Sequence, residues 1–407
     1  MKFRFNRLGC VALFIMLLAS CATYQENVAP TRIMRAQQEI PEDQLMDVGI
    51  LPFESEKLTE KEAEAEGTSN EIRKAEGHFI PNHLKHTLQQ SGHWGAVRVI
   101  PSQTDSTDLF VKGQIEESNG EHLTLEIDVV DATGRHWFTK EYKKEASQFA
   151  YAGNRPGEKD AYQDLYNAIA NDMAEFKKKL TADDIKKIRS TSRLKFAKDF
   201  APDAFAGYLA TGKKNRTEIK RLPADDDPMM ARLLKIRERE YMFIDTLNEH
   251  YDAFYREMWP SYENWRQLNM TERRAMREIK HKAIKQQLIG ALLIAGAIAA
   301  GSADSSAMAA VQTSMIIIGS QVIIDGWNVS KEAEIHEAAI QELSESFSSE
   351  MTPVVMEFEG RQYRLTGTAE EQFEQWRAIL RNIYFAETGF GPQPAQEPVD
   401  SDQPESQ

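Results

Sequence analysis

The sequence predicts an α+β protein in which an N-terminal α/β domain, with a mixed sheet and an antiparallel meander, precedes a mainly α-helical domain with a small β-hairpin. Three observations support this fold class. Short apolar runs separated by turn residues fill 46–180. Apolar residues three and four positions apart dominate 181–386. Two short strand-like runs flank a Glu-Gly turn at 353–366 within that helical region.

The α/β domain opens with DVGILPF at 47–53, an apolar run typical of a buried central strand. A helix ending at Gly92 and a second strand, WGAVRVIP, are expected next. Three further runs, two of them alternating between apolar and polar residues, predict a meander with turns at 119–120 and 131–134. An amphipathic helix over 160–180 closes the domain, with Tyr162, Leu165, Tyr166, Ile169, Met173, Phe176 and Leu180 on its apolar stripe.

The helical domain is expected to contain several separate helices. A helix over 229–258 should stop at Trp259-Pro260, because proline interrupts helical bonding. Its predicted apolar stripe is Met230, Leu234, Tyr241, Ile244, Leu247, Tyr251, Phe254 and Met258. A new helix should begin near Thr271, an N-cap residue. Later helices are expected beyond Asp325 and after the β-hairpin, the last with Phe373, Trp376, Leu380 and Ile383 inward.

Residues 286–325 form the most apolar part of the chain and predict a helical hairpin around Asp304, the one charge before its last residue. Each uncharged half is near the length that crosses a hydrocarbon core of about 30 Å. In one interpretation the hairpin is the centre of a soluble bundle, covered by helices 229–258 and 327–350. In the other it enters lipid or packs against neighbouring copies, with the basic run Arg273–Lys285 on anionic head groups. The apolar stripes favour the first interpretation.

The N-terminus combines a basic segment, MKFRFNRLGC, a short apolar core, VALFIMLL, and the sequence LASC. This arrangement resembles the signal of bacterial lipoproteins. The resemblance implies a signal peptide over 1–20, cleavage between Ser20 and Cys21, and lipidation of Cys21 with membrane attachment through its acyl chains. In the family's sorting rule an aspartate after the cysteine retains the protein in the inner membrane, so Ala22 implies the outer membrane.

Composition limits the remaining expectations. Residues 21–45 are polar without periodicity and are expected to be a tether, whereas 387–407 should be a disordered acidic tail. The net charge of −14 argues against nucleic acid as a partner. Because Cys10 and Cys21 are the only cysteines, the body has no disulfide and no thiolate metal site.

Two stretches partly match functional motifs. GYLATGKK at 207–214 approaches the phosphate-binding loop G-x-x-x-x-G-K-[ST], but Lys214 stands where that loop needs a hydroxyl for magnesium. We expect instead a helix C-cap at Gly212 followed by a solvated basic turn. His336 opens a sequence like the zinc-protease motif H-E-x-x-H, but Ile340 replaces the second histidine, and a place in the core is expected for His336.

Histidines also cluster in the α/β domain, where four lie within sixteen residues: His78, His83, His86 and His93. The inner two share a helix face, whereas Pro81 and Gly92 are expected to separate the outer two from that helix. No fixed set of zinc ligands results. We therefore expect no metal site, no cofactor and no catalytic residues, although residues far apart in sequence could still assemble an enzyme site.

Several elements of 46–180, including ILPFE, SGHWGAVRVIPS, DLFVKGQIEE and IDVVDATGRHWFTKEY, resemble a periplasmic α/β domain of envelope lipoproteins. This domain occurs in the curli-export channel, in polysaccharide-export lipoproteins and in lipoprotein activators of penicillin-binding proteins; the second half is not recognised. The resemblance implies a periplasm-facing, non-enzymatic scaffold or assembly component of an export or envelope-assembly complex, with envelope proteins as partners and a homo-oligomer left open. A regulator of a peptidoglycan-synthesising enzyme is the alternative, and a periplasmic enzyme the third.

Overall fold

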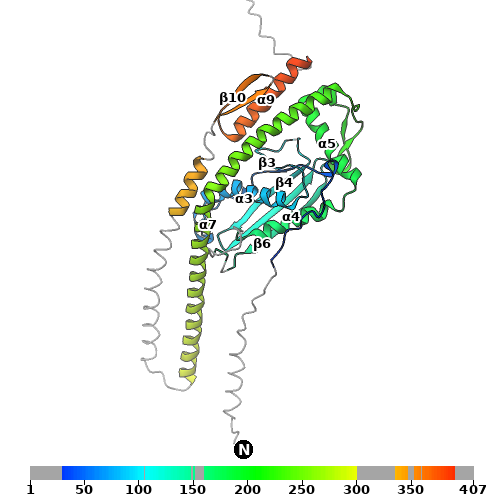
Figure 1. Ribbon diagram of the computed structural model, residues 1–407. Helices are drawn as coiled ribbons and strands as arrows, with labels where there is room; N and C mark the ends of the chain where they lie inside the picture. Colours follow the sequence, from blue (N-terminus) through cyan, green and yellow to red (C-terminus); the bar gives the residue numbers. More distant parts are fainter. Residues whose placement is uncertain are drawn as a thin grey trace, which may run out of the picture.

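A computed structural model describes residues 30–104, 106–147, 150–151, 160–299, 335–346, 353–358 and 360–389. Within these ranges the predicted fold class is confirmed: a mixed sheet with an antiparallel meander is followed by a mainly helical region with a small β-hairpin (Figure 1). The predicted signal peptide, Ser20, Cys21, residues 300–325 and residues 390–407 lie outside the described residues.

The main sheet of the described chain has the strand order β3-β1-β4-β5-β6, with the short β2 beside β4. Strand β1 runs parallel to both of its neighbours, and all three of its residues are buried, as expected for a strand covered on both faces. Strands β4, β5 and β6 form the predicted antiparallel meander. The bounds are β1 Val48–Ile50, β2 Glu54–Ser55, β3 Val97–Val99, β4 Leu109–Ser118, β5 His122–Asp131 and β6 His136–Glu145.

Helices α3 and α4 bury their apolar stripes in one core with the inward-facing residues of the sheet. In α4 the predicted inward positions Leu165, Tyr166, Ile169 and Met173 are all buried. The helices of this part are η1 Glu42–Gln44, α2 Glu60–Glu66, α3 Asn70–Ser91 and α4 Gln163–Lys177. Helix α3 ends at Gly92 in a left-handed cap, as predicted.

The expectation that Pro81 would interrupt α3 is wrong. Proline has no amide to donate to the carbonyl of Gly77, four residues earlier. That carbonyl instead accepts a hydrogen bond of 2.8 Å from the amide of Phe53, so the lost helical bond is replaced from outside. Since Gly77 has no side chain, the backbone of Phe53 can approach this closely. Helix α3 therefore continues through Pro81.

The expected break at Trp259-Pro260 is also wrong, because α7 runs as one helix over Pro228–Ala299. Pro260 is exposed, whereas Met258 and Tyr262 on the opposite side are buried in the core, so packing continues past the proline. Thr271 does not cap a new helix. Its hydroxyl donates a hydrogen bond of 2.8 Å to the carbonyl of Gln267, within α7.

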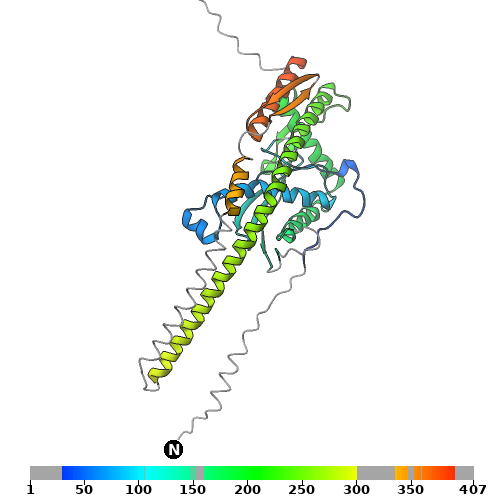
Figure 2. The ribbon, with the colours of Figure 1, turned by 60° about the vertical axis from the view of Figure 1, so that its left-hand side comes forward.

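The 72 residues of α7 extend over about 108 Å. Figures 1 and 2 show that its first part lies along the body and its last part projects beyond it. Residues 258 and 286 lie on the same helix, about 42 Å apart along its axis. The helix 229–258 therefore does not cover residues 286–299, as the soluble-bundle interpretation required.

The remaining elements pack around the first part of α7. The predicted β-hairpin is confirmed, with a left-handed Gly360 in its turn. Helix α9 buries Phe373, Trp376 and Leu380 as predicted, but Tyr384 is fully buried where Ile383 was expected. The bounds are α5 Ala182–Phe200, α6 Pro202–Phe205, β7 Leu209–Thr211, η2 Lys213–Asn215, β8 Thr217–Ile219, β9 Val354–Phe358, β10 Arg361–Leu365 and α9 Ala369–Thr388, with a further helical segment over 335–346.

Both buried cores combine residues from before and after position 180. The first joins the inner face of the sheet to Ile185 and Ile188 of α5 and to Met258 and Trp265 of α7. The second joins α5, α7, α9 and the β9-β10 hairpin to Val99 at the end of β3, to the following Ile100 and to Phe110 of β4. The helical region is thus packed onto the sheet. Within α7, Leu233 is buried and the predicted stripe residue Leu234 is exposed.

Candidate functional site

The end of the predicted tether is attached to the body. The carbonyls of Thr31 and Arg32 accept hydrogen bonds of 2.8 and 2.9 Å from Asn167 and Asn171 on α4. The Asn171 carbonyl oxygen accepts from the amide of Met34 at 2.7 Å. Of the stretch expected to be a tether, only residues 22–30 then separate Cys21 from the attached segment, and the chain from Cys21 to Thr31 reaches at most about 35 Å.

At the point where α7 extends beyond the body, it is hydrogen-bonded to the turn between β4 and β5. Gly120 in this turn has φ +77°, and an added Cβ would collide with the backbone carbonyl of Arg266. Asn269 donates to the Asn119 carbonyl at 2.9 Å and also to that of Gly67. A glycine is required here for the turn and for the close approach of α7.

The first half of the predicted basic run also binds the body. Arg274 donates to the buried carboxylate of Glu121 at 3.0 Å and to the Ala146 carbonyl at 2.7 Å, and Arg277 pairs with the same carboxylate. Arg273 donates to the Ala65 carbonyl at 3.1 Å. These three arginines are therefore not simply solvated, and they are not free to lie on lipid head groups.

A buried ion pair lies beneath this junction. The guanidinium of Arg266, which is 1 % exposed, donates to the Asp160 carboxylate at 2.8 Å and lies 4.4 Å from the ring centre of Tyr262. Burial alone would raise the pKa of Asp160, but the charges of Arg266 and His83 outweigh burial and lower it. The pair connects α7 to the residue that bonds the backbone of Tyr162 at the start of α4.

The histidine cluster contributes to the contact between α3 and α7. His83 bonds the Tyr255 hydroxyl at 2.7 Å and Gln163 at 3.0 Å, and His86 bonds Asp252 at 2.9 Å. These contacts explain their place on one face of α3. Burial lowers the pKa of His83, and it lowers that of His78 to about 4.

These shifts predict that acid destabilises the protein. Below pH 6.5 the unfolded chain binds a proton at each histidine, whereas folded His78 stays neutral until about pH 4. The unfolded state then holds more protons, so the free energy of unfolding should fall as the pH falls from 6.5 to 4. Denaturant titrations across this range should give a shallower fall for His78→Phe than for the wild type. If the free energy of unfolding fell equally steeply with pH in the wild type and in His78→Phe, His78 would not be a cause of the acid destabilisation.

The stretch GYLATGKK does not form the expected helix C-cap at Gly212. Leu209–Thr211 is strand β7, which pairs with β8 in a tight hairpin. Its turn holds Lys214 and Asn215, which have φ of 57° and 56°. The hairpin is fixed to the sheet, because the amide of Thr217 donates to the Thr133 carbonyl at 2.8 Å in the β5-β6 turn. The short 3-10 helix η2 and then strand β8 follow Gly212 in place of the α-helix that a phosphate-binding loop needs.

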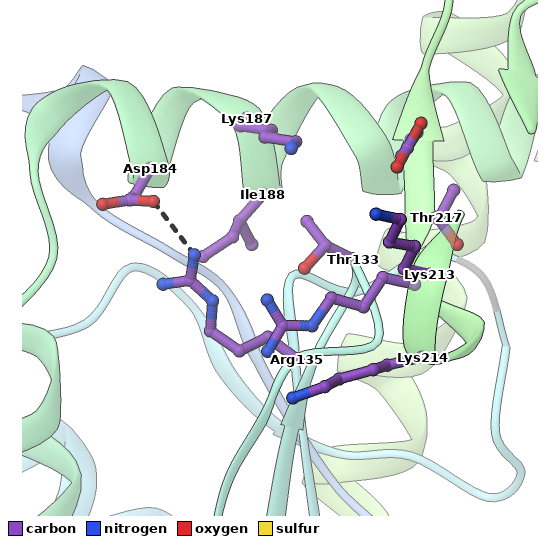
Figure 3. A pocket seen from close by; sticks show the side chains of 10 residues that line it. Thr133, Arg135, Asp184, Lys187, Ile188, Lys213, Lys214 and Thr217 are labelled. Atoms are coloured by element: carbon purple, nitrogen blue, oxygen red, sulfur yellow. Dashed lines mark hydrogen bonds and ion pairs between the residues drawn. The ribbon is translucent and has the colours of Figure 1, made fainter. Parts of the chain in front are cut away.

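The hairpin forms one wall of a pocket of about 360 Å³ (Figure 3). Figure 3 shows Arg135 reaching it from the β5-β6 turn, Lys187 from α5, and Lys213 and Lys214 from the hairpin. Arg135 donates to Asp184 at 3.1 Å; the amide and hydroxyl of Thr181, and then Arg135, lower the pKa of that carboxyl. We call the following residues the basic pocket: Thr133, Arg135, Asp184, Lys187, Ile188, Lys213, Lys214, Arg216, Thr217 and Glu218.

The basic pocket was not predicted from the sequence. Its cations come from three segments, at 135, 187 and 213–216, and no local pattern connects them. The only signal was the GKKNR turn itself, which was expected to be a solvated loop. The expectation that His336 lies in the core is wrong: it is partly exposed, whereas Ile340 and Ser344 of the segment 335–346 are buried.

In the part of the chain that the structure describes, no group of three or more His, Cys, Asp or Glu is placed to hold a metal ion. In the same residues, no helix combines the length and apolar character needed to cross a bilayer. Neither a protein-family model nor a curated protein matches the chain.

Proposed function

We propose that this protein is an outer-membrane lipoprotein, anchored through Cys21, that acts as a non-enzymatic scaffold in an export or envelope-assembly complex. Helix α7 is the observation that carries the proposal. It is one continuous helix. Its first part is bonded to the folded body, and its last part projects from the body. A projecting helix of this kind can hold a binding partner at a fixed distance from the body.

The position of the N-terminal segment supports an arrangement relative to the membrane. In Figures 1 and 2 the first described residues, in dark blue, leave the body on the side toward which α7 projects. From Arg277, the last arginine bound to Glu121, to Ala299 the helix extends about 33 Å. The chain from Cys21 to the attached Thr31 reaches about 35 Å at most. The membrane that holds Cys21 is therefore within reach of the projecting end.

We place the apolar sequence 286–299 at the surface of this membrane. The sequence puts Lys280, Lys282 and Lys285 directly before it, where anionic head groups would attract them. The lipid anchor would keep the domain at high local concentration near its partners, so that weak contacts suffice for assembly.

Photo-crosslinking in cells tests the anchor and the scaffold together. A photoreactive residue in place of Met276, which is 53 % exposed on α7, should capture an envelope protein. Adding Cys21→Ala should reduce capture by about tenfold or more, because the anchor no longer concentrates the protein at the membrane. Cys10→Ala is the matched control and should leave capture unchanged. No captured partner, or equal capture with Cys21→Ala, would contradict the proposal.

A further inference from the structure

We propose that the basic pocket binds a soluble diphosphate or polyphosphate group. Five cationic side chains and two carboxylates line it, which gives a net charge of 5 − 2 = +3 in a chain whose net charge is −14. Two phosphate groups, each with about 1.5 to 2 negative charges near pH 7, match this excess. Arg135 and Arg216 supply planar donors suited to phosphate oxygens.

The cations are available for a ligand. Within the described residues, an ion pair is found for Arg135, with Asp184, but none for Lys187, Lys213, Lys214 or Arg216. Three like charges at 213, 214 and 216 on one tight turn repel one another when nothing neutralises them. An anion between the hairpin, α5 and the β5-β6 turn would relieve this repulsion.

Hydrogen bonds fix the backbone of two walls of the pocket, the β5-β6 turn and strand β8. The carboxylate of Asp131 accepts hydrogen bonds from the amides of Thr133 and Arg135 at 2.9 and 3.2 Å and from the Trp137 indole at 3.0 Å. These bonds fix the β5-β6 turn that carries Arg135. The carbonyl of Thr133 in this turn accepts the hydrogen bond that holds strand β8.

The conformation of Lys214 supports a role in binding over a role in folding. Its φ of 57° is unfavourable for a long side chain, and glycine or asparagine is the usual residue at such positions. A strained residue that is kept in a turn of this kind is typical of functional sites. Here the strained residue is a lysine whose side chain lines the pocket (Figure 3).

The place of the pocket in the fold favours a soluble ligand over a lipid head group. The pocket lies at the β5-β6 turn, whereas α7 leaves the body at the β4-β5 turn, at the other end of β5. The ten residues of β5 separate these ends by about 30 Å. If the membrane lies on the side of the projecting helix, as the proposed function has it, the pocket is far from its surface.

Calorimetric titration of the full chain in detergent with inorganic pyrophosphate tests the inference. We expect saturable binding that weakens as salt is raised. Arg216→Gln and Lys214→Asn should each weaken it about tenfold, the loss of one charge-assisted contact. Lys214→Asn should also raise the unfolding temperature, because asparagine tolerates the left-handed conformation. Lys198→Gln, an exposed lysine on α5 outside the pocket, is the matched control and should bind like the wild type.

Several results would overturn the inference. Absence of pyrophosphate binding is one, and equal weakening by Lys198→Gln and Arg216→Gln is another. In a second arm, vesicles of phosphatidylcholine with phosphatidic acid compete with pyrophosphate. Competition that depends on Arg216 would assign the pocket to a lipid source and contradict the soluble one. Because the titration needs no membrane, it can succeed or fail independently of the proposed scaffold function.

Discussion

Arg266→Met is expected to lower the free energy of unfolding by about 3 to 5 kcal/mol. Arg266 is the cation of a fully buried ion pair. A methionine of similar length in its place would leave the Asp160 carboxylate in the core with no cation beside it. A buried charge that loses its partner is far more costly than an exposed one. Urea or thermal unfolding of the purified full chain measures the loss.

Two comparisons separate this charge effect from loss of volume. In the double variant Asp160→Asn/Arg266→Met the carboxylate is neutralised while the bond to the Tyr162 amide can persist, so it should be more stable than Arg266→Met alone. Lys178→Met breaks the exposed pair with Glu175 and should lower the free energy of unfolding far less than Arg266→Met does. A loss below 1 kcal/mol for Arg266→Met would contradict the role of the pair.

The strands and their turns could be predicted because their signals are local. Alternation along 109–131 defines which side chains face the core, and Gly120 and Gly134 mark turns that need positive φ. The buried set Leu123, Leu125, Ile127 and Val129 follows directly from this period of two.

The helix boundaries failed where tertiary contacts override local propensity. Pro81 and Pro260 are breakers by their own chemistry. In the fold, Phe53 replaces the bond lost at Pro81, and the buried face around Tyr262 carries α7 past Pro260. Phe53 is distant in sequence from Pro81, and Tyr262, although close to Pro260, is buried against distant residues such as Phe79 and Glu76.

The contacts of the basic run and the basic pocket could not be predicted from the sequence for a related reason. One interpretation of the sequence placed Arg273, Arg274 and Arg277 on lipid head groups, because their acceptors at 65, 121 and 146 lie far away in the chain. The basic pocket likewise depends on three segments that only the fold brings together. Local patterns identified the GKKNR turn but not the walls that make it a pocket.

The projecting end of α7 is expected to bind lipid. We expect the full chain lacking its signal and carrying Cys21→Ala to bind anionic vesicles through the sequence 286–299. Leu292→Asp with Leu293→Asp should weaken this binding about tenfold or more, because an aspartate is strongly disfavoured in apolar lipid. Leu222→Asp, at an apolar residue that is 58 % exposed on the body, is the matched control and should bind like the parent variant. Vesicle sedimentation measures all three.

The depth of α7 in a membrane tests whether residues 286–299 lie at the membrane that holds Cys21. Because the proposal removes Cys10 and acylates Cys21, the only two cysteines, an introduced cysteine is the only free thiol in the mature protein. Spin labels at Met276→Cys and Ala297→Cys can be compared in vesicles holding the lipidated protein. We expect oxygen to relax the label at 297 more than a water-soluble nickel complex does, and the reverse for the label at 276. A label at 297 that is as accessible to nickel as the one at 276, or shielded from both reagents, would contradict this expectation.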